Sequence, residues 1–276
     1  MADSLSAEVG AYLSEDIGAG DITANLIPIN VQAEAFVITR EHMVVCGQPW
    51  FNEVFKLLNP DVTIAWQVAE GEYVVEGSTL CSLNGSARAI LSGERTALNL
   101  LQTLSATATI ARKYAEAVAG TQCKVLDTRK TIPGLRKAQK YAVACGGSHN
   151  HRMGLYDGIL IKENHIIAAG SIEKAVKSAR QQSTVSVEVE VESVLEFQEA
   201  SEAKPDRIML DNFALEDLRA AVALNQGAIE LEASGNITLE NIRSIAETGV
   251  DFISIGSLTK NIKAIDLSMR INLVTP

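Results

Sequence analysis

The run from Lys124 to His165 concentrates the side chains that could do chemistry. It contains eight basic residues and three acidic ones, a surplus of five positive charges, in a chain whose formal net charge is −10. A positive cluster on an acidic protein attracts a small polyanion, whereas the acidic remainder of the surface repels nucleic acid and anionic membranes. We therefore expect a small anionic substrate, and neither nucleic acid nor a membrane as a partner.

The cations of this run follow short apolar segments. A segment over 124–126 leads into Arg129 and Lys130, and a second one over 158–161 leads into Lys162. From 124 onward such segments alternate with helical patterns, which predicts a parallel sheet of βα units. The expected strands are 124–126, 158–161, 184–191, 207–210, 228–232 and 251–255, and the expected helices are 133–145, 171–181, 193–202, 214–225 and 238–247.

Six βα units with polar strand ends favour a closed βα barrel over an open doubly wound sheet, and the residues alone leave six, seven or eight strands open. The fold class that we expect is an incomplete βα barrel of six or seven strands. No G-x-G-x-x-G motif follows any of the strands, which argues against a dinucleotide-binding domain. Ligands bind at the carboxyl ends of the strands in such barrels. The residues at those ends are Thr128, Arg129 and Lys130, then Lys162, then Glu190, then Asp211, then Ser234, Gly235 and Asn236, and finally Ile255, Gly256 and Ser257.

The residue types at successive strand ends suggest that different ends bind different parts of a ligand. Gly/Ser turns expose backbone N–H groups that bind phosphate, so 234–236 and 255–257 suit a sugar phosphate, although ordinary turns have the same composition. The carboxylates of Glu190 and Asp211 suit ribose hydroxyls, directly or through Mg²⁺. Alternation puts Glu188, Glu190 and Glu192 on one face of their strand, where an ion-pair network with Lys162 and Arg129 is the structural alternative.

Residues 33–93 read differently, as short period-two segments interrupted by a helix over 49–58, which predicts an α+β module. One of these segments is expected over 87–91. A long helix is expected from Ser92 to about Val118, and it places Arg95 in its first turn. A cation there opposes the helix dipole, which hints at a functional role.

The cysteines, the N-terminus and the histidines give no sign of disulfides, of a membrane segment or of a structural metal site. Four scattered cysteines without a C-x-x-C pair predict buried thiols in a reducing, cytoplasmic compartment. The N-terminus has no basic and apolar signal-peptide pattern, and no apolar run reaches the length of a membrane span. His149 and His151 lack further His or Cys ligands at suitable spacing, so a structural zinc site is not expected.

Three motifs carry a resemblance to a known family: D-T-R-K-T-I-P-G-L-R from Asp127, N-H-R-x-G from Asn150, and L-I-K-E-N-H from Leu160. With E-D-I-G-A-G-D-I-T from Glu15 and I-S-I-G-S-L-T-K from Ile253, they resemble quinolinate phosphoribosyltransferase. The resemblance implies an N-terminal α+β open sandwich domain over 1–103. It further implies a catalytic barrel over 104–266 and a C-terminal segment over 267–276 that returns to the first domain.

The resemblance also implies a reaction and a set of roles. The family joins quinolinate to 5-phosphoribosyl-1-pyrophosphate with loss of CO₂ and pyrophosphate, giving nicotinate mononucleotide for NAD synthesis. It implies Mg²⁺ near Glu190 and Asp211, and a homodimer or larger oligomer in which Arg95 reaches across the interface. The implied catalytic residues are Lys130, Lys162, Glu190 and Asp211. The implied binding residues are these four with Arg95, Thr128, Arg129, His151, Arg152, 234–236 and 255–257, and His149 has no assigned role.

Two other readings remain open from the sequence. A related transferase would act on another pyridine or pyrimidine carboxylate, and substrate competition would separate it from the first reading. A non-catalytic sensor would bind phosphoribosyl-pyrophosphate without releasing pyrophosphate. The presence of Lys130, Glu190 and Asp211 together argues against the sensor.

Overall fold

A computed structural model describes residues 2–274 of the chain, so residues 1, 275 and 276, including the last two of the expected C-terminal segment, lie outside the described residues. The chain divides into two compact units. The N-terminal unit contains residues 2–109 and 262–274, and the barrel unit contains residues 110–261. Each unit is described separately below.

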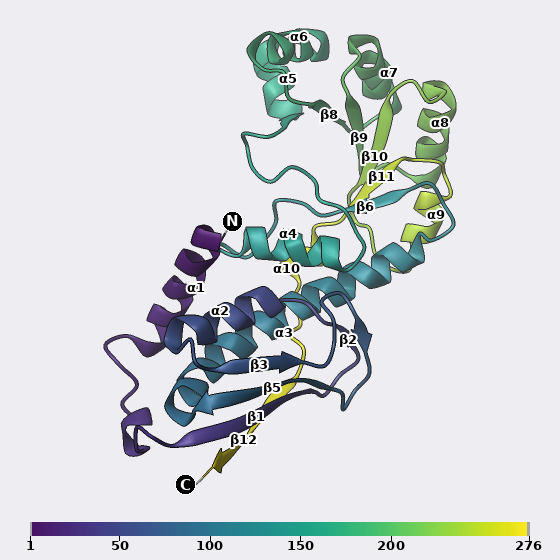
Figure 1. The fold of residues 1–276 in the computed structure, drawn as a ribbon. Coiled ribbons are helices and arrows are strands. Elements are labelled where there is room, and N and C mark those ends of the chain that lie inside the picture. Colours follow the sequence, from purple (N-terminus) through teal and green to yellow (C-terminus); the bar gives the residue numbers. More distant parts are fainter. Residues whose placement is uncertain (1, 275–276) are drawn as a thin grey trace. The chain divides into compact units, whose positions relative to one another are not determined.

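The N-terminal unit is built on a four-stranded antiparallel sheet. Its strand order is β12-β1-β5-β3, and β12 pairs with β1 from Thr39↔Leu267 to Gln32↔Val274. Inward positions of β1 alternate with half-exposed ones, as a strand with one buried face requires. The helix α2 and the first part of α3 lie over one face of the sheet (Figure 1). The elements are α1 (Ala2–Ile17), η1 (Ala24–Leu26), β1 (Gln32–Thr39), β2 (Met43–Val44), α2 (Gln48–Leu58), β3 (Thr63–Trp66), β4 (Tyr73–Val74), β5 (Thr79–Ser86), the start of α3 (Ala87–Ala117), and β12 (Leu267–Val274).

The long helix α3 begins earlier than its sequence pattern indicates. The expected strand over 87–91 is wrong, because this segment forms the first turns of α3. Ala87 and Ile90 are fully buried, so their burial on one helix face, and not a strand, explains the apolar pattern. Arg95 therefore lies in the third turn of α3, and the argument from a cation opposing the helix dipole at the first turn does not hold.

The barrel unit contains a parallel sheet of six strands in the order β6-β11-β10-β9-β8-β7. Read from β7, the strands follow chain order and return to β6, which is the order of an incomplete barrel. The six-stranded alternative is therefore confirmed. The elements are β6 (Lys124–Leu126), α4 (Arg136–Cys145), β7 (Ile159–Ile161), α5 (Glu163–Ala169), α6 (Ile172–Gln182), β8 (Val187–Val191), α7 (Val194–Ala203), β9 (Arg207–Asp211), α8 (Leu215–Asn225), β10 (Glu230–Ser234), α9 (Ile242–Ala246), β11 (Phe252–Ser254) and α10 (Ser257–Lys260).

A short segment covers part of the gap between β6 and β7. His149 forms an isolated parallel bridge with Leu126, in which the His149 amide donates to the Val125 carbonyl at 2.8 Å. The His149 carbonyl in turn accepts from the Asp127 amide at 3.0 Å. Residues 149–152, which we call the recognition loop, therefore start beside the carboxyl end of β6.

The two faces of the parallel sheet differ in polarity. Val187, Val189 and Val191 of β8 belong to a buried apolar cluster that includes the helices outside the sheet. Helices α6 to α9 lie along this outer side (Figure 1). The alternate residues Glu188 and Glu190 point the other way, toward the barrel interior, because successive side chains of a strand face opposite sides. The interior of the barrel unit is consequently polar, and its stability comes from the outer layer.

The cysteines are mostly buried, as expected. Cys46, Cys81 and Cys123 are buried, and Cys145, at the end of α4, is half-buried. Burial raises the pKa of Cys81 to about 12, and burial with the nearby Asp251 and Glu232 carboxylates does the same for Cys123.

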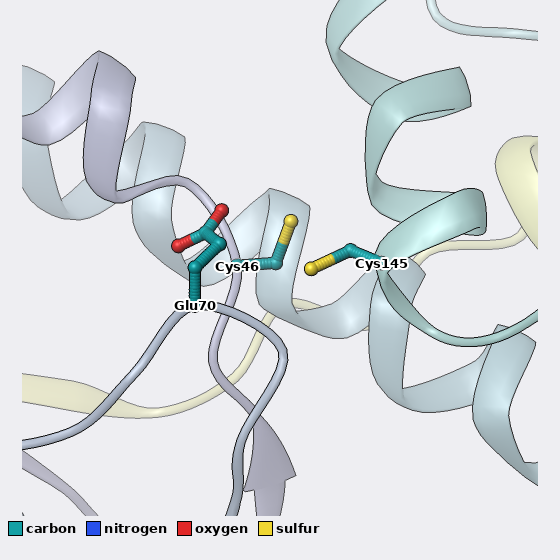
Figure 2. A group of neighbouring side chains, drawn as sticks. All are labelled: Cys46, Glu70 and Cys145. Atoms are coloured by element: carbon teal, nitrogen blue, oxygen red, sulfur yellow. The ribbon is translucent and has the colours of Figure 1, made fainter.

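Within the N-terminal unit, Cys46 lies next to the start of α2, and Figure 2 labels it together with Glu70. The Glu70 carboxylate accepts the amide N–H groups of Gly47 at 2.8 Å and of Gln48 at 3.1 Å. An anionic side chain at the N-terminus of a helix is favourable, so Glu70 has a structural role there. Across residues 2–274, helices with the length and apolar character of a membrane span are not found.

Candidate active site

The first cavity of the barrel unit is charged. It has a volume of about 400 Å³ and opens at the carboxyl ends of the strands. We call it the charged cavity; it is lined by Thr128, Arg129, Lys130, His151, Arg152, Leu160, Lys162, Glu190, Met209, Asp211, Ser234 and Ser254.

A second cavity adjoins the first one and shares Thr128, Lys130, Asp211, Ser234 and Ser254 with it. It has a volume of about 690 Å³ and is lined largely by residues of loops and turns. We call it the glycine-lined cavity; its other lining residues are Tyr114, Asn212, 235–238, 255–257, Lys260 and Asn261.

The loop after β6 presents Arg129 to the charged cavity. Its Nε is buried, yet it has no hydrogen-bond partner among the described residues. Buried guanidinium donors are normally satisfied, so an unpartnered one beside a cavity is suited to an anionic ligand. Arg136 of α4 holds the loop from behind, because its guanidinium donates to the Arg129 carbonyl and to the Met153 carbonyl, each at 3.3 Å.

Arg152 adds a second guanidinium to the same cavity. Its Nη1 donates to the Gly158 carbonyl at 2.8 Å, which fixes the side chain. Burial, followed by the repulsion of Arg129, lowers the pKa of Arg152. Two neighbouring guanidinium groups repel each other unless an anion lies between them, so the pair favours a carboxylate or phosphate in this cavity.

Lys162 and Glu190 form an ion pair at the rim of the charged cavity. Lys162 precedes α5, and its amide donates to Nδ1 of His165 at 3.0 Å. His165 is thus a hydrogen-bonded structural residue. The lysine side chain is about half exposed, so an incoming ligand can compete with the carboxylate for it.

A buried cluster of His151, Glu188 and Glu232 lies beneath the charged cavity. His151 Nε2 is 2.9 Å from Glu188 Oε2 and 3.5 Å from Glu232 Oε2. Arg207 Nη1 contacts the same Glu232 oxygen at 3.1 Å, and its guanidinium stacks on the Phe252 ring. The expected network is therefore only partly correct: Lys162 pairs with Glu190, but Glu188 pairs with His151 and not with Arg129, and Glu192 is exposed.

The charges of this cluster are balanced through the histidine. Burial alone would lower the pKa of His151, but its hydrogen bonds to Glu188 and Glu232 raise that pKa to about 9. Burial and the Glu232 charge raise the pKa of Glu188, whereas contacts with His151 outweigh burial and lower the pKa of Glu232. The Arg152 amide also lies 2.8 Å from His151 Nδ1.

Asp211 is held by a chain of amide side chains at the ends of β9 and β10. Its Oδ2 accepts from Asn212 Nδ2 at 2.8 Å, and Asn212 Oδ1 accepts from Asn236 Nδ2 at 3.0 Å. Asn212 and Asn236 both adopt left-handed backbone conformations, with φ of 57° and 49°. Asparagine tolerates this conformation better than other residues with a side chain, because its short polar side chain can form local hydrogen bonds.

Gly235 lies between these asparagines, and replacing it with alanine is expected to damage the glycine-lined cavity. Its φ is 93°, and an added Cβ would lie 2.6 Å from Asn212 Cγ and 3.0 Å from the Asn212 amide nitrogen. We expect Gly235→Ala to weaken the binding of a phosphate ligand in this cavity by about tenfold, from left-handed strain of about 1–2 kcal/mol and displacement of the turn. Titration with inorganic phosphate measures this, with Gly227→Ala, which is also left-handed but in open space, as the control. An equal effect of both changes would contradict a role of Gly235 in binding.

The turn after β11 completes the glycine-lined cavity. Gly256 allows the Lys130 side chain to approach closely, since an added Cβ would lie 2.9 Å from Lys130 Cδ. Ser257 Oγ is buried without a hydrogen-bond partner among the described residues. An unsatisfied hydroxyl beside a turn of small residues matches the donor set of a phosphate site.

The structure brings the predicted residues together with one exception. Every predicted binding residue other than Arg95 lines one of the two cavities of the barrel unit. Arg95 belongs to the N-terminal unit, where it is exposed on α3. Sequence reasoning placed Asn212 at a strand end without assigning it a role, and it missed Glu232. Glu232 alternates with Ser234 on β10, so period-two alternation could have identified it as inward-facing.

Comparisons with known proteins identify the family of the chain. The family model for the N-terminal domain of quinolinate phosphoribosyl transferase matches residues 21–105, and the model for the C-terminal domain matches residues 107–270. A probable nicotinate-nucleotide pyrophosphorylase (carboxylating) of Bacillus subtilis is 43% identical over 95% of this chain and 91% of its own length. The chloroplastic nicotinate-nucleotide pyrophosphorylase (carboxylating) of Arabidopsis thaliana is 41% identical over 97% of this chain and 83% of its own length.

Solved structures give the same result. The nicotinate-nucleotide pyrophosphorylase from Francisella tularensis superposes with a TM-score of 0.95 at 49% identity, covering 98% of this chain and 96% of that one. NadC from Streptococcus pyogenes superposes with a TM-score of 0.96 at 38% identity, covering 100% and 99%. Both domains are matched, in order and almost completely. The chain therefore belongs to the quinolinate phosphoribosyltransferase family.

Proposed function

We propose that the two cavities carry out the family's reaction: transfer of the phosphoribosyl group of 5-phosphoribosyl-1-pyrophosphate to quinolinate, with decarboxylation to nicotinate mononucleotide. The observation that carries this proposal is that the two cavities adjoin each other at the carboxyl ends of the strands. One is lined by several cations, among them Arg129, whose buried Nε has no partner within residues 2–274. The other is lined by residues of turns, among them Ser257, whose buried Oγ also has no partner there. A diacid and a sugar phosphate can therefore bind side by side.

Quinolinate carries two adjacent carboxylates, which need cationic partners. Arg129 and Arg152 offer planar guanidinium groups that suit bidentate carboxylate binding, and Lys162 adds a third positive charge. The pyridine ring can lie against the apolar side chains of Leu160 and Met209, which also line the charged cavity. His151 borders the same space.

Phosphoribosyl-pyrophosphate would extend from the second cavity into the first. The backbone of 234–236 and 255–257 with Ser257 Oγ suits the 5′-phosphate, and the carboxylates of Glu190 and Asp211 suit the ribose hydroxyls. Lys130 lines both cavities, so it is positioned for the pyrophosphate.

The hard oxygen donors of Glu190 and Asp211 also fit a divalent cation. Mg²⁺ bound near them with the pyrophosphate would neutralise part of the charge of the leaving group. The same two carboxylates face the ribose in this proposal, so the ion would be held jointly by protein and substrate.

The chemistry follows from these placements. The C1–O bond of the ribose breaks, and pyrophosphate leaves with the electron pair while Lys130 and Lys162 stabilise its negative charge. Glu190 and Asp211 stabilise the positive charge that develops on the ribose ring. The lone pair of the quinolinate nitrogen forms the new C1–N bond. The bond between C2 and its carboxylate then breaks, CO₂ leaves, and C2 takes up a proton.

Substrate competition tests the assignment. The protein, phosphoribosyl-pyrophosphate and Mg²⁺ are incubated with quinolinate, nicotinate or orotate, and pyrophosphate release is followed. Of the three acids, we expect only quinolinate to give pyrophosphate release. Nicotinate and orotate carry a single carboxylate, which leaves one of the guanidinium groups unpaired. Turnover of nicotinate or orotate in preference to quinolinate would favour a related transferase, and binding without release would favour a sensor.

The proposal also covers the cellular compartment and the oligomeric state of the enzyme. We place the enzyme in the cytoplasm as a homodimer or larger oligomer, and we propose that Arg95 of a second copy completes the diacid site. Support comes from the exposure of Arg95 on a helix rich in small residues. Arg95→Ala should raise the KM for quinolinate, and mixing it with a second inactive variant of the barrel unit, such as Lys130→Ala, should restore part of the activity.

A further inference from the structure

A buried ion pair lies directly behind the recognition loop. Asp127 follows β6, Lys140 is in the middle of α4, and both side chains are fully buried. Lys140 Nζ donates to the Asp127 carboxylate and, at 2.9 Å, to the His151 carbonyl. Neither residue lines the charged or the glycine-lined cavity, so neither is placed to touch a substrate.

The loop is bound to this ion pair through its own backbone and side chains. Asp127 Oδ1 accepts the His151 amide at 2.9 Å, and Oδ2 accepts from Asn150 Nδ2 at 2.6 Å. Asn150 Nδ2 also donates to the Lys140 carbonyl at 2.8 Å. The amide and the carbonyl of His151 are thus both held by the ion pair, one by each partner.

Burying two charged side chains in this space costs free energy. Burial raises the pKa of Asp127 and lowers that of Lys140, which shows that the environment disfavours both charges. Apolar residues of similar volume often give equal or greater stability than a buried ion pair. They could not accept the His151 amide or donate to its carbonyl, so the hydrogen bonds to the loop are what the charges add.

The loop positions two of the proposed substrate-binding residues. His151 and Arg152 follow Asn150 directly, and both line the charged cavity. The loop is not part of a helix or strand, and its one ladder contact is the bridge at His149. The ion pair therefore replaces the secondary structure that would otherwise fix His151 and Arg152.

We propose that Asp127, Lys140 and Asn150 are positioning residues, which hold His151 and Arg152 in the geometry that binds the diacid. The proposal rests on the function proposed above. It concerns the diacid alone, because none of the residues of the recognition loop lines the glycine-lined cavity.

Asn150→Ala is the sharpest test, because Asn150 is exposed and its loss leaves no buried charge unpaired. We expect the KM for quinolinate to rise about three- to tenfold, while kcat and the KM for phosphoribosyl-pyrophosphate change less than about twofold. Gln182→Ala, which removes an exposed amide bonded within α6, is the matched control and should change none of these values. An unchanged quinolinate KM in folded Asn150→Ala, or an equal rise for both substrates, would overturn the proposal.

A second readout does not depend on activity. Amide hydrogen exchange of the peptide that contains His151 and Arg152 should be faster in Asn150→Ala than in the wild-type protein and the control. Equal exchange would overturn the proposal even if the wild-type protein did not use quinolinate. If the wild-type protein releases no pyrophosphate, the proposed function fails. Faster exchange in Asn150→Ala would still show that Asn150 holds the recognition loop in place.

The ion pair itself is tested with both charges removed together. Lys140→Met alone leaves the Asp127 charge buried and unpaired, so this variant is expected to fold poorly. The double variant Asp127→Asn with Lys140→Met avoids that charge, and we expect it to fold with a raised quinolinate KM. A folded double variant with the wild-type quinolinate KM would contradict the positioning role.

Discussion

Replacing Glu190 with glutamine is expected to lower kcat by about 10²–10³-fold, the largest effect of any single change in the site. The loss of one preorganised charge aimed at the transition state typically has this magnitude. Glutamine keeps the size of the side chain and a hydrogen-bonding oxygen, but it removes the negative charge that we propose faces the ribose. Because the Glu190 side chain is only 16% exposed, solvent cannot fully replace that charge.

Steady-state kinetics with both substrates measure the effect, and the neighbouring Glu192 supplies the control. Glu192→Gln removes a charge from the same segment, but Glu192 is exposed and lines neither cavity. We expect its kcat to remain within about twofold of the wild-type value, as is usual for an exposed charge. A kcat of Glu190→Gln within a few-fold of the wild-type value would remove Glu190 from the chemical step.

Replacing Arg129 with alanine is expected to raise the KM for quinolinate by about 10- to 100-fold. Hydrogen bonds to charged groups contribute about 1.5–3 kcal/mol, and this range corresponds to that loss of affinity. The buried Nε without a partner makes Arg129 the residue most in need of an anionic ligand. Arg129→Lys should give an intermediate KM, because lysine keeps the charge but loses the planar, bidentate donor set.

The control for this prediction is another arginine of the barrel unit. Arg112 is exposed on α3 and pairs with Glu116 one helical turn away, at 2.6 Å. Arg112→Ala should leave both KM values unchanged, since exposed ion pairs contribute little. If Arg129→Ala and Arg112→Ala have the same KM for quinolinate, the diacid does not bind at Arg129.

The residues expected to form the site line the two cavities, apart from Arg95, whereas the bounds of several expected strands differ from those observed. Apolar segments followed by charged residues identified β6 and β7, and therefore Arg129, Lys130 and Lys162. The strand expected over 228–232 is instead β10 (Glu230–Ser234). Asn225 explains the shift, because its side chain bonds both the amide and the carbonyl of Ile229 and holds that residue in a turn.

Other features depend on contacts that local patterns do not encode. Asp127 and Lys140 look like surface charges in the sequence, and only the fold brings them together in the interior. The short helices α5 and α10 were not predicted, since a few polar residues after a strand resemble a loop. The segment over 87–91 alternates like a strand but is helical, because tertiary packing of α3 overrides the local propensity.

The inward face of the barrel unit explains why the strand ends were informative. Glu188, Arg207 and Glu232 face the interior of the sheet, while the outer face supplies the apolar core. Polar residues at alternate strand positions are costly to bury, so they indicate either an ion-pair network or a ligand. The barrel unit has both, with the ion pairs beneath and the two cavities above.

The most direct test of the central claim is a crystal structure of the protein with nicotinate mononucleotide. We expect the 5′-phosphate to contact the backbone of 235–236 and 256–257, and the pyridine carboxylate to lie within hydrogen-bond distance of Arg129 or Arg152. Glu190 and Asp211 should face the ribose between them. A nucleotide bound outside these two cavities, or bound with its phosphate against Arg129 and Arg152, would contradict the account.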